Sequence, residues 1–554
     1  MGSTPEDAYA KARTERQEHV DIVLRSTSRK KIVVAGPGTG KTHLFKRLLE
    51  GKENTLTLTF VNSLVEDLSL ELCGLSSVRT LHSFARRQLM AGGESVKVFP
   101  KLSEVIRQDS RMLLKEDISF DDLFYKRLDD SEYIDFYLNR REYYSHYGYT
   151  DVIWFLVQRF EKEPHKVPLY EQVVVDEFQD FNQLEVSLIE LLASKSPVLL
   201  AGDDDQALYD FKSASTDHIR ERHTDAKRGY APFTLPFCSR CTRVVIDAAN
   251  DIIREARKRG FLKGRIEKQF LYFKDRDKDQ ECSGNPKILH THTYDKQIPW
   301  YIEKSINKIA EELRGKFSVL IISPFRQQST RIVEALKAKG FESIESVGIR
   351  DEKEPTLLDG LNILLDDKES NLGWRIVSAF LHEPEEFEGL VKQTHADTAP
   401  RMSNIIGEGK KIETMKMLSI LKAILNGKEI DRESLDEFLK KVKVDQYDRA
   451  KEFLRHEIAR RSPRKGNQSV RKIPINATTV QGSKGLAAEY VFITHFDDRY
   501  FIKSEDKTKI SDYDICNFLV ALTRTKRRLF LISSDKGRVP TFLKWVNVSR
   551  VEKG

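Results

Sequence analysis

Short apolar runs followed at once by glycine or acidic residues recur in the first half of the chain. The run VVV at residues 173–175 leads into DEFQD, and the run IVV at residues 32–34 leads into AGPGTGKT. Runs of this kind predict buried strands, and the segments with helical periodicity between them predict helices. Because α/β proteins bind ligands at the carboxyl ends of parallel strands, the pattern predicts an α/β fold with a site at that edge.

The residues after the strand at 173–175 fit a magnesium and water site. Asp176 is placed to hold a magnesium ion, and Glu177, beside it, is placed to orient a water molecule. Gln179 and Asp180 add two further polar groups within reach of the same pocket.

The segment after residues 32–34 predicts a phosphate-binding loop. It has the pattern G-x-x-x-x-G-K-T between a predicted strand and a predicted helix. The glycines let the backbone curl so that its N–H groups face a phosphate, and the dipole of the helix adds to the attraction. Lys41 is expected to reach the β- and γ-phosphates, and Thr42 to bind magnesium. The predicted loop comprises Gly36, Pro37, Gly38, Thr39, Gly40, Lys41 and Thr42. With the acidic strand downstream, it predicts a nucleoside-triphosphatase.

Composition sets broad bounds on the protein. A chain of 554 residues is too long for one core, so we expect about three or four domains. A hydrophobic content of 40% and a charged content of 32% are ordinary for a globular protein, and no run is long and apolar enough to span a bilayer. The net charge of +7 permits nucleic-acid binding without requiring it.

The five cysteines predict a reducing compartment, because they form no disulfide framework in a chain of this size. We therefore expect a cytoplasmic protein. Cys238 and Cys241 form a CxxC motif, but a structural zinc site would need two more ligands at close spacing. We interpret the pair as two small residues that happen to fall three apart.

Polar and aromatic residues follow several other predicted strands. Gln206 comes after a run of aspartates at the end of one strand. The others are Phe60, Asn62, His82, Phe84, Tyr209 and Phe211. Residues 95–165 form a charged, aromatic and mainly helical segment whose rings could stack on single-stranded bases. We interpret Trp154, Phe155 and Phe160 as core residues, because aromatic residues at helical spacing usually pack inside.

The order of these motifs resembles superfamily 1 helicases of the UvrD/Rep/PcrA group. The matching segments are AGPGTGKT, TLTFVN, TLHSF, VVVDEFQD and AGDDDQALYDF, followed by a segment with the core K-G-L and by VALTRTK. The resemblance implies two RecA-like domains with parallel sheets, and ATP and Mg²⁺ as cofactors. It implies that Asp176 binds magnesium, Glu177 activates water, and Gln206, Arg240 and Arg524 contact the γ-phosphate. Gln17, on the helix ahead of the first strand, is assigned to the nucleotide.

The resemblance also implies a partner, which is single-stranded or partly duplex DNA, and a 3′ to 5′ direction of movement. The expected DNA contacts are Phe60, Asn62, His82, Phe84, Tyr209, Phe211 and Gln481, with Phe211 stacking on a base. Three positions depart from the family pattern. Gln481 replaces a histidine, Ala487 replaces a glutamate that contacts the nucleotide sugar, and the neighbours of Arg240 in CSRC differ from N-Y-R-S.

The resemblance predicts four parts of the chain. The first RecA-like domain comprises residues 1–94 and 166–255, with a helical insertion at 95–165. The second comprises residues 256–350 and 471–554, with a helical insertion at 351–470. The short stretch after the last predicted strand leads us to expect no fused nuclease domain.

Three functions remain open on the sequence. The first is a DNA-stimulated ATPase that moves along single strands and unwinds duplex. The second is an ATPase subunit that regulates a partner nuclease, for instance in an anti-phage defence system such as Gabija. The third is a non-catalytic nucleic-acid-binding scaffold with a relic ATP site.

Overall fold

The computed structural model describes most of the chain. The described residues are 5–60, 62–129, 131–208, 213–313, 316–341, 343–346, 354–395, 398–428, 430–442, 473–504, 506, 509–535 and 537–554. They divide into two compact units. The sheet unit comprises Met1–Phe84, Arg159–Arg350 and Arg471–Gly554, and the helical unit comprises Ala85–Gln158 and Asp351–Val470.

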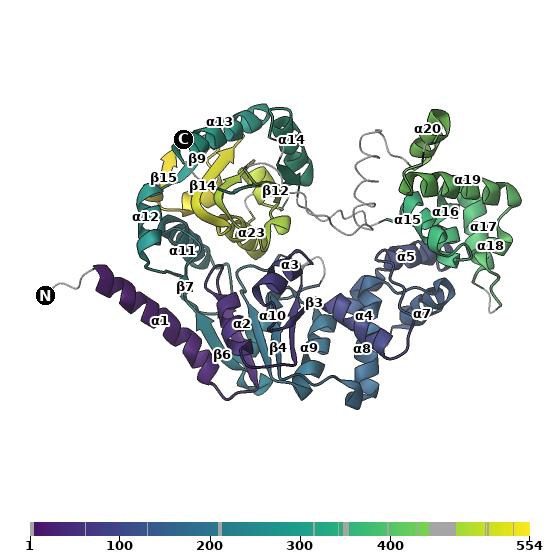
Figure 1. Ribbon diagram of the computed structural model, residues 1–554, viewed down its shortest axis with the longest axis horizontal. Helices are drawn as coiled ribbons and strands as arrows, with labels where there is room; N and C mark the ends of the chain where they lie inside the picture. The colour runs from purple at the N-terminus through teal and green to yellow at the C-terminus, as the bar shows by residue number, and fades with distance from the viewer. Residues whose placement is uncertain are drawn as a thin grey trace. The chain divides into compact units, whose positions relative to one another are not determined.

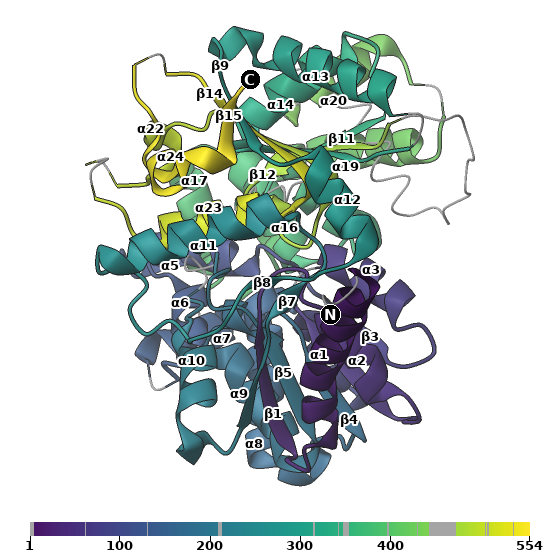
Figure 2. The same ribbon diagram turned by 90° about the vertical axis from the view of Figure 1, so that its left-hand side faces the viewer.

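The first sheet of the sheet unit has six parallel strands in the order β3-β2-β4-β5-β1-β6. Residues of β2, β4 and β5 are buried throughout, as expected for parallel strands covered by helices on both faces. Figure 2 shows α1 and α2 on one side of β1, and α9 and α10 on the other. The strands are β1 (Lys30–Ala35), β2 (Thr55–Thr59), β3 (Ser77–Thr80), β4 (Gln172–Val175), β5 (Val198–Gly202) and β6 (Ala231–Leu235). The helices are α1 (Pro5–Arg25), α2 (Lys41–Leu49), α3 (Asn62–Glu71), α4 (Leu81–Ala91), α9 (Gln183–Lys195) and α10 (Asp217–Thr224).

The second sheet of the same unit has seven parallel strands in the order β11-β12-β10-β13-β14-β9-β15. The strands are β9 (Ile288–His292), β10 (Val319–Ser323), β11 (Ile344–Ser346), β12 (Ile475–Thr479), β13 (Ala488–Ile493), β14 (Thr525–Ser533) and β15 (Val551–Lys553). Its helices are α11 (Arg243–Lys258), α12 (Arg276–Gly284), α13 (Ile298–Glu312), α14 (Arg326–Lys337), α22 (Asp498–Phe501), α23 (Asp512–Leu522) and α24 (Thr541–Trp545). A small sheet pairs β7 (Phe237–Cys238) with β8 (Leu271–Tyr272).

A shared apolar core joins the elements around the second sheet to the end of β5. It contains Leu208 after β5, Cys238 of β7, Val245 of α11, Val491 of β13 and Leu519 of α23. The predicted α/β fold with large parallel sheets is therefore confirmed, and the ends of both sheets are held by one packed cluster.

The helical unit is built from two segments that are far apart in the sequence (Figure 1). The first segment carries α5 (Leu102–Leu113), α6 (Phe120–Tyr125), α7 (Glu132–Tyr144) and the start of α8 (Tyr149–Lys162). The second carries α15 (Leu357–Asp366), α16 (Asn371–Leu381), α17 (Pro384–Gln393), α18 (Met402–Ile405), α19 (Glu408–Leu425) and α20 (Arg432–Lys441). Residues 95–158 of the first predicted insertion and the second predicted insertion thus fall in one unit, although the four-part division itself stays a prediction.

Aromatic side chains of the helical segment at 95–165 pack inside. Trp154 is 8% exposed, and Phe160 is 2% exposed. Phe155 is partly buried, with its ring edge-on to that of Trp154. The interpretation of Trp154 and Phe160 as core residues is confirmed.

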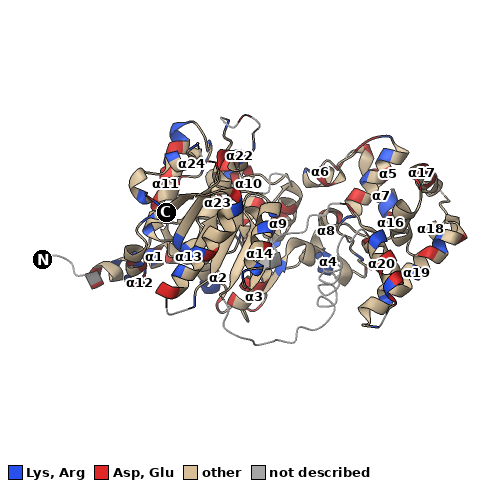
Figure 3. Ribbon diagram, turned by 90° about the horizontal axis from the view of Figure 1, so that it is seen from above, with Lys and Arg blue, Asp and Glu red and all other residues tan. Residues whose placement is uncertain are grey.

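Figure 3 shows charges of both signs interspersed on α19 and α20. Within the described residues, no helix combines the length and apolar character needed to cross a membrane.

Candidate nucleotide-binding site

The loop between β1 and α2 has the backbone conformation of a phosphate cradle. Gly38 has φ of 70° and Gly40 has φ of 99°, which places both in the left-handed region that favours glycine. Thr39 Oγ1 donates to the carbonyl of Gly36 at 2.8 Å and holds the loop closed. Gly40 is the N-cap of α2 and provides no side-chain cap. The N–H groups of the first helical turn therefore remain for an anionic ligand.

Strand β4 is followed directly by two carboxylates, Asp176 and Glu177, which lie beside this loop. Asp176 is 6% exposed, and its Oδ1 has no hydrogen-bond partner. Glu177 has φ of 56°, which is uncommon for a residue other than glycine and marks backbone strain of the kind found at active sites. Lys41 Nζ lies 3.4 Å from Glu177 Oε1, and the side-chain amide of Gln179 donates to Glu177 Oε2 at 2.7 Å.

These charges set one another's protonation. Burial and the nearby Glu177 raise the pKa of Asp176. Burial raises the pKa of Glu177, but Lys41 and Lys484 outweigh it and hold that pKa below its usual value. Burial lowers the pKa of Lys41, but Glu177 and Asp176 outweigh it in turn. Lys41 and Glu177 therefore stay charged at neutral pH, as phosphate binding and water orientation require.

The loop and the acidic strand fit a magnesium ion. A buried carboxylate oxygen without a partner is costly unless a cation or water satisfies it. Asp176 Oδ1 is such an atom, and Thr42 is the second residue of α2, next to Lys41. Oxygen ligands of these types suit Mg²⁺.

Two buried cations from the second sheet, Lys484 and Arg524, donate hydrogen bonds to Gln206. Lys484 Nζ pairs with Asp180 and donates to the carbonyl of Gln206 at 2.8 Å. Arg524, in the turn between α23 and β14, donates to Gln206 Oε1 at 2.6 Å. Burial and the neighbouring Arg240 lower the pKa of Arg524 to about 10, which still leaves it charged at neutral pH. The backbone carbonyl and the side-chain oxygen of Gln206 thus each accept a hydrogen bond from a residue of the second sheet.

Arg240 lies directly against the phosphate-binding loop. A Cβ at Gly38 would be 2.3 Å from the Cβ of Arg240, so only glycine permits this approach. The backbone N–H of Ser239 donates to the carbonyl of Gly38 at 3.0 Å. The structure therefore brings together Lys41, Glu177, Gln206, Arg240 and Arg524, all predicted from the sequence.

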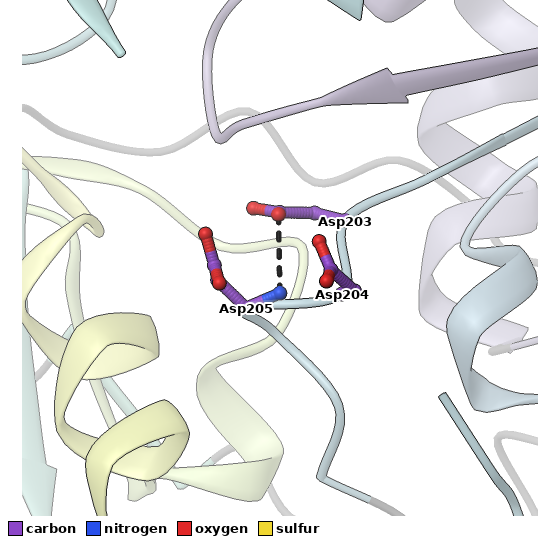
Figure 4. Close-up of side chains that lie close together, drawn as sticks. All are labelled: Asp203, Asp204 and Asp205. Carbon is purple, nitrogen blue, oxygen red and sulfur yellow. Dashed lines mark hydrogen bonds between the residues drawn. The ribbon is translucent and has the colours of Figure 1, made fainter. Parts of the chain in front are cut away.

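The three aspartates before Gln206 form a cluster of their own (Figure 4). Lys268 Nζ contacts Asp203 and Asp205 at 2.9 Å each and also contacts Asp204. Arg265 donates to both carboxylate oxygens of Asp205, at 2.7 and 2.8 Å. Because buried cations already neutralise these carboxylates, we interpret the cluster as a support for the turn that carries Gln206, rather than as a metal site.

Arg16 on α1 borders the site and was not predicted from the sequence. Its guanidinium donates to Ser239 Oγ at 3.2 Å and lies 4.6 Å from the ring centre of Phe273. It would be 3.0 Å from a Cβ at Gly40, so it borders the loop. Its neighbour Gln17 donates instead to Asp21 on the same helix at 2.8 Å. The position of Arg16 next to Gln17, which was assigned to the nucleotide, is the sequence feature that could have identified it.

Comparison with known proteins matches the part of the chain that carries β1 to β5 and the first segment of the helical unit. Residues 16–146 and 130–227 match the family model for the UvrD/REP helicase N-terminal domain. The resemblance to the UvrD/Rep/PcrA group of superfamily 1 helicases is confirmed.

Two relatives show how far the similarity to this group extends. The chain is 24% identical over 293 residues to the ATP-dependent DNA helicase PcrA of Staphylococcus aureus, which is 44% of this chain and 40% of that protein. It is 24% identical over 283 residues to PcrA of Staphylococcus epidermidis, which is 42% of this chain and 39% of that protein. The matched part of the chain thus spans about 40% of the length of these UvrD/Rep/PcrA relatives.

The structure shows the hydrogen bonds made at two positions near the departures from the UvrD/Rep/PcrA pattern. Glu489, two residues after Ala487, accepts hydrogen bonds from the backbone N–H and the hydroxyl of Ser318. It is the second residue of β13, directly after Ala487 and Ala488. The side-chain amide of Gln481 donates to the hydroxyl of Tyr513 at 2.7 Å.

The residues predicted to contact DNA divide into three groups. Phe84 is 1% exposed and packs in the core, so its predicted DNA contact is withdrawn. Phe60, His82 and Gln481 are partly buried at or near strand ends, and the ring of Phe60 lies 5.7 Å from that of Phe181. Tyr209, Phe211 and the side chain of Asn62 lie outside what the structure describes.

Proposed function

We propose that the chain is an ATP-dependent single-stranded DNA translocase and DNA helicase that hydrolyses ATP between its two sheets. The observation that supports this most directly is the pair of hydrogen bonds that Gln206 accepts from the second sheet. Lys484 and Arg524 come from the second sheet, and both reach Gln206 at the end of β5 in the first. A group that contacts the γ-phosphate is thereby connected to the position of the second sheet.

The hydrolytic step follows from the charges around the loop. Phosphoryl transfer to water needs neutralised phosphate charge and an aligned nucleophile. Lys41 and Arg240 border the loop, and Arg524 approaches from the second sheet. Glu177, ionised and fixed by Gln179, orients the water and accepts its proton. A magnesium ion held by Thr42 and Asp176 supplies further charge neutralisation when bound.

Movement along DNA follows from closure and opening of the space between the sheets. ATP binding favours contact of Arg524 and Arg240 with the γ-phosphate, and hydrolysis removes that contact. A single strand bound across both sheets is then advanced once per cycle. We propose the 3′ to 5′ direction from the resemblance to the UvrD/Rep/PcrA group.

The test is the ATPase rate of the purified protein with single-stranded DNA, duplex DNA and RNA in parallel, with strand displacement followed in the same samples. We expect stimulation by single-stranded DNA and displacement of a strand. Lys41→Ala and Glu177→Gln should abolish turnover without unfolding the protein. Lys46→Ala is a matched control, because Lys46 lies on the same helix but pairs with Glu71 on the surface. Normal turnover by Glu177→Gln would refute the assignment.

A second function that we propose as a candidate is a DNA-stimulated ATPase subunit that regulates a partner nuclease. The observation that favours it is the loss of the glutamate at Ala487, which Glu489 does not replace because it is bound to Ser318. This predicts ATP turnover that DNA stimulates but little strand displacement by the chain alone. Robust displacement without a partner would count against it.

A further inference from the structure

The two cysteines of the CSRC segment lie at the junction between the phosphate-binding loop and the second sheet. Both are fully buried and neither forms a disulfide. A Cβ at Gly38 would be 3.3 Å from Cys238 Sγ, so this sulfur packs against the loop. Cys241 Sγ donates to the carbonyl of Thr523 at 3.5 Å, one residue before Arg524. Arg240 therefore stands between two thiols that contact the two sides of the site.

Cys241 also contacts the sulfur of Cys238 through its backbone. The backbone N–H of Cys241 donates to Cys238 Sγ at 3.5 Å. Burial raises the pKa of Cys238, but hydrogen bonding from Cys241 and the nearby Arg240 outweigh it and lower that pKa below its usual value. The pKa of Cys241 is raised by its hydrogen bond to Cys238 and by burial. A pair of cysteines three residues apart, in which one thiol has the lower pKa, is the arrangement of CxxC sites that form disulfides.

We propose that Cys238 and Cys241 are a reversible oxidation site that switches the nucleotide site off. The oxidant is a hydroperoxide, such as hydrogen peroxide. The Cys238 thiolate attacks one peroxide oxygen, which gives a sulfenic acid and, after protonation, water. The Cys241 thiol then attacks the sulfenic sulfur, which forms the S–S bond and releases a second water molecule. Two thiols are oxidised and one peroxide is reduced.

The disulfide acts on the site through the contacts that it removes. Once oxidised, Cys241 has no S–H to donate to the carbonyl of Thr523. The S–S bond also draws together the ends of the four-residue segment that positions the Cβ of Arg240 against Gly38. Arg240 is thereby displaced from the loop. The loss of ATP turnover rests on the proposed function, whereas formation of the disulfide does not.

Peptide mapping tests the disulfide directly. Trypsin cleaves after Arg228, Arg240 and Arg243, so Cys238 and Cys241 fall in the separate peptides 229–240 and 241–243. We expect peroxide treatment of the folded chain to produce these peptides as one disulfide-linked species, which a reductant separates. Absence of the linked species at a peroxide concentration that oxidises the exposed Cys73 would overturn the proposal. So would linkage of Cys238 to Cys282, the partly exposed cysteine whose sulfur accepts from the backbone of Arg243.

ATP turnover tests the switch. We expect peroxide to lower the rate of the unmodified chain by about tenfold or more, because an arginine that stabilises phosphoryl transfer contributes about 10³-fold or more. A reductant should restore the rate. Cys238→Ser and Cys241→Ser should each remove this sensitivity, read as the ratio of rates before and after peroxide, whereas Cys73→Ser and Cys282→Ser should retain it. Persistent sensitivity in both CSRC variants would overturn the switch. If the linked species forms in a chain without ATP turnover, the proposed function fails and the oxidation site stands.

Discussion

Arg524 donates to the side-chain oxygen of Gln206 at 2.6 Å, across the boundary between the two sheets. Arg524 follows α23 of the second sheet, and Gln206 follows β5 of the first. Both side chains are buried, so the contact is little screened by solvent. The hydrogen bond therefore connects the segment after β5 of the first sheet to the turn before β14 of the second.

Arg524→Ala should lower kcat for ATP by about 10²-fold or more and leave the KM nearly unchanged, because we propose that this arginine acts on the transferred phosphate. Steady-state ATPase assays with single-stranded DNA check it. Arg243→Ala is the matched control, since Arg243 lies in the same unit but is half-exposed and pairs with Asp279. An equal loss in both variants would mean that Arg524 acts only through the fold.

Lys484→Met should destabilise the sheet unit, because it leaves the buried Asp180 without its cation. Breaking a buried ion pair from one side costs about 3–5 kcal/mol. Burial already raises the pKa of Asp180 to about 6 despite Lys484. Urea denaturation gives the loss. The double variant Lys484→Met/Asp180→Leu should recover part of it, and a double variant as unstable as the single one would contradict the explanation.

Asp109→Ala should destabilise the helical unit strongly. Asp109 of α5 is fully buried and pairs with Arg140 of α7 and Arg375 of α16, at 2.8 Å each. Its removal leaves two buried guanidinium groups without a carboxylate partner, which costs about 3–5 kcal/mol.

The matched control is Asp117→Ala, which removes two ion pairs, with Arg107 and Arg111, that lie at the surface. We expect little change in its denaturation midpoint, because exposed pairs are screened by water. Similar denaturation midpoints for the two variants would show that the buried ion pairs of Asp109 stabilise the helical unit no more than exposed ones.

Phe325→Ala should weaken binding of single-stranded DNA. Phe325 follows β10 at the carboxyl edge of the second sheet, is 54% exposed, and contacts Tyr500 edge-on at 5.9 Å. Stacking of one base on an aromatic ring contributes about 1–3 kcal/mol, so we expect at least about fivefold weaker binding by fluorescence anisotropy. Val548→Ala, at a residue 85% exposed near the C-terminus, should bind normally. Unchanged binding by Phe325→Ala would exclude this ring as a stacking site.

Much of the nucleotide site could be predicted because its signals are local. The glycines at 38 and 40 fix the loop conformation within a few residues, and the β-branched run at 173–175 fixes a buried strand that ends just before Asp176. The core positions of Trp154 and Phe160 followed from helical periodicity. Phe84 was assigned to DNA because a strand end does not reveal whether the following side chain turns inward.

The sequence by itself determined the buried strands, the phosphate-binding loop and the acidic residues after β4, because backbone conformation and burial pattern depend on neighbouring residues. Only the tertiary structure decided that CSRC packs against Gly38, that Glu489 binds Ser318 instead of lying in the site, and that Arg524 meets Gln206. The last contact joins residues 318 positions apart. Contacts at such separation depend on how whole sheets and helices pack, which no local pattern encodes.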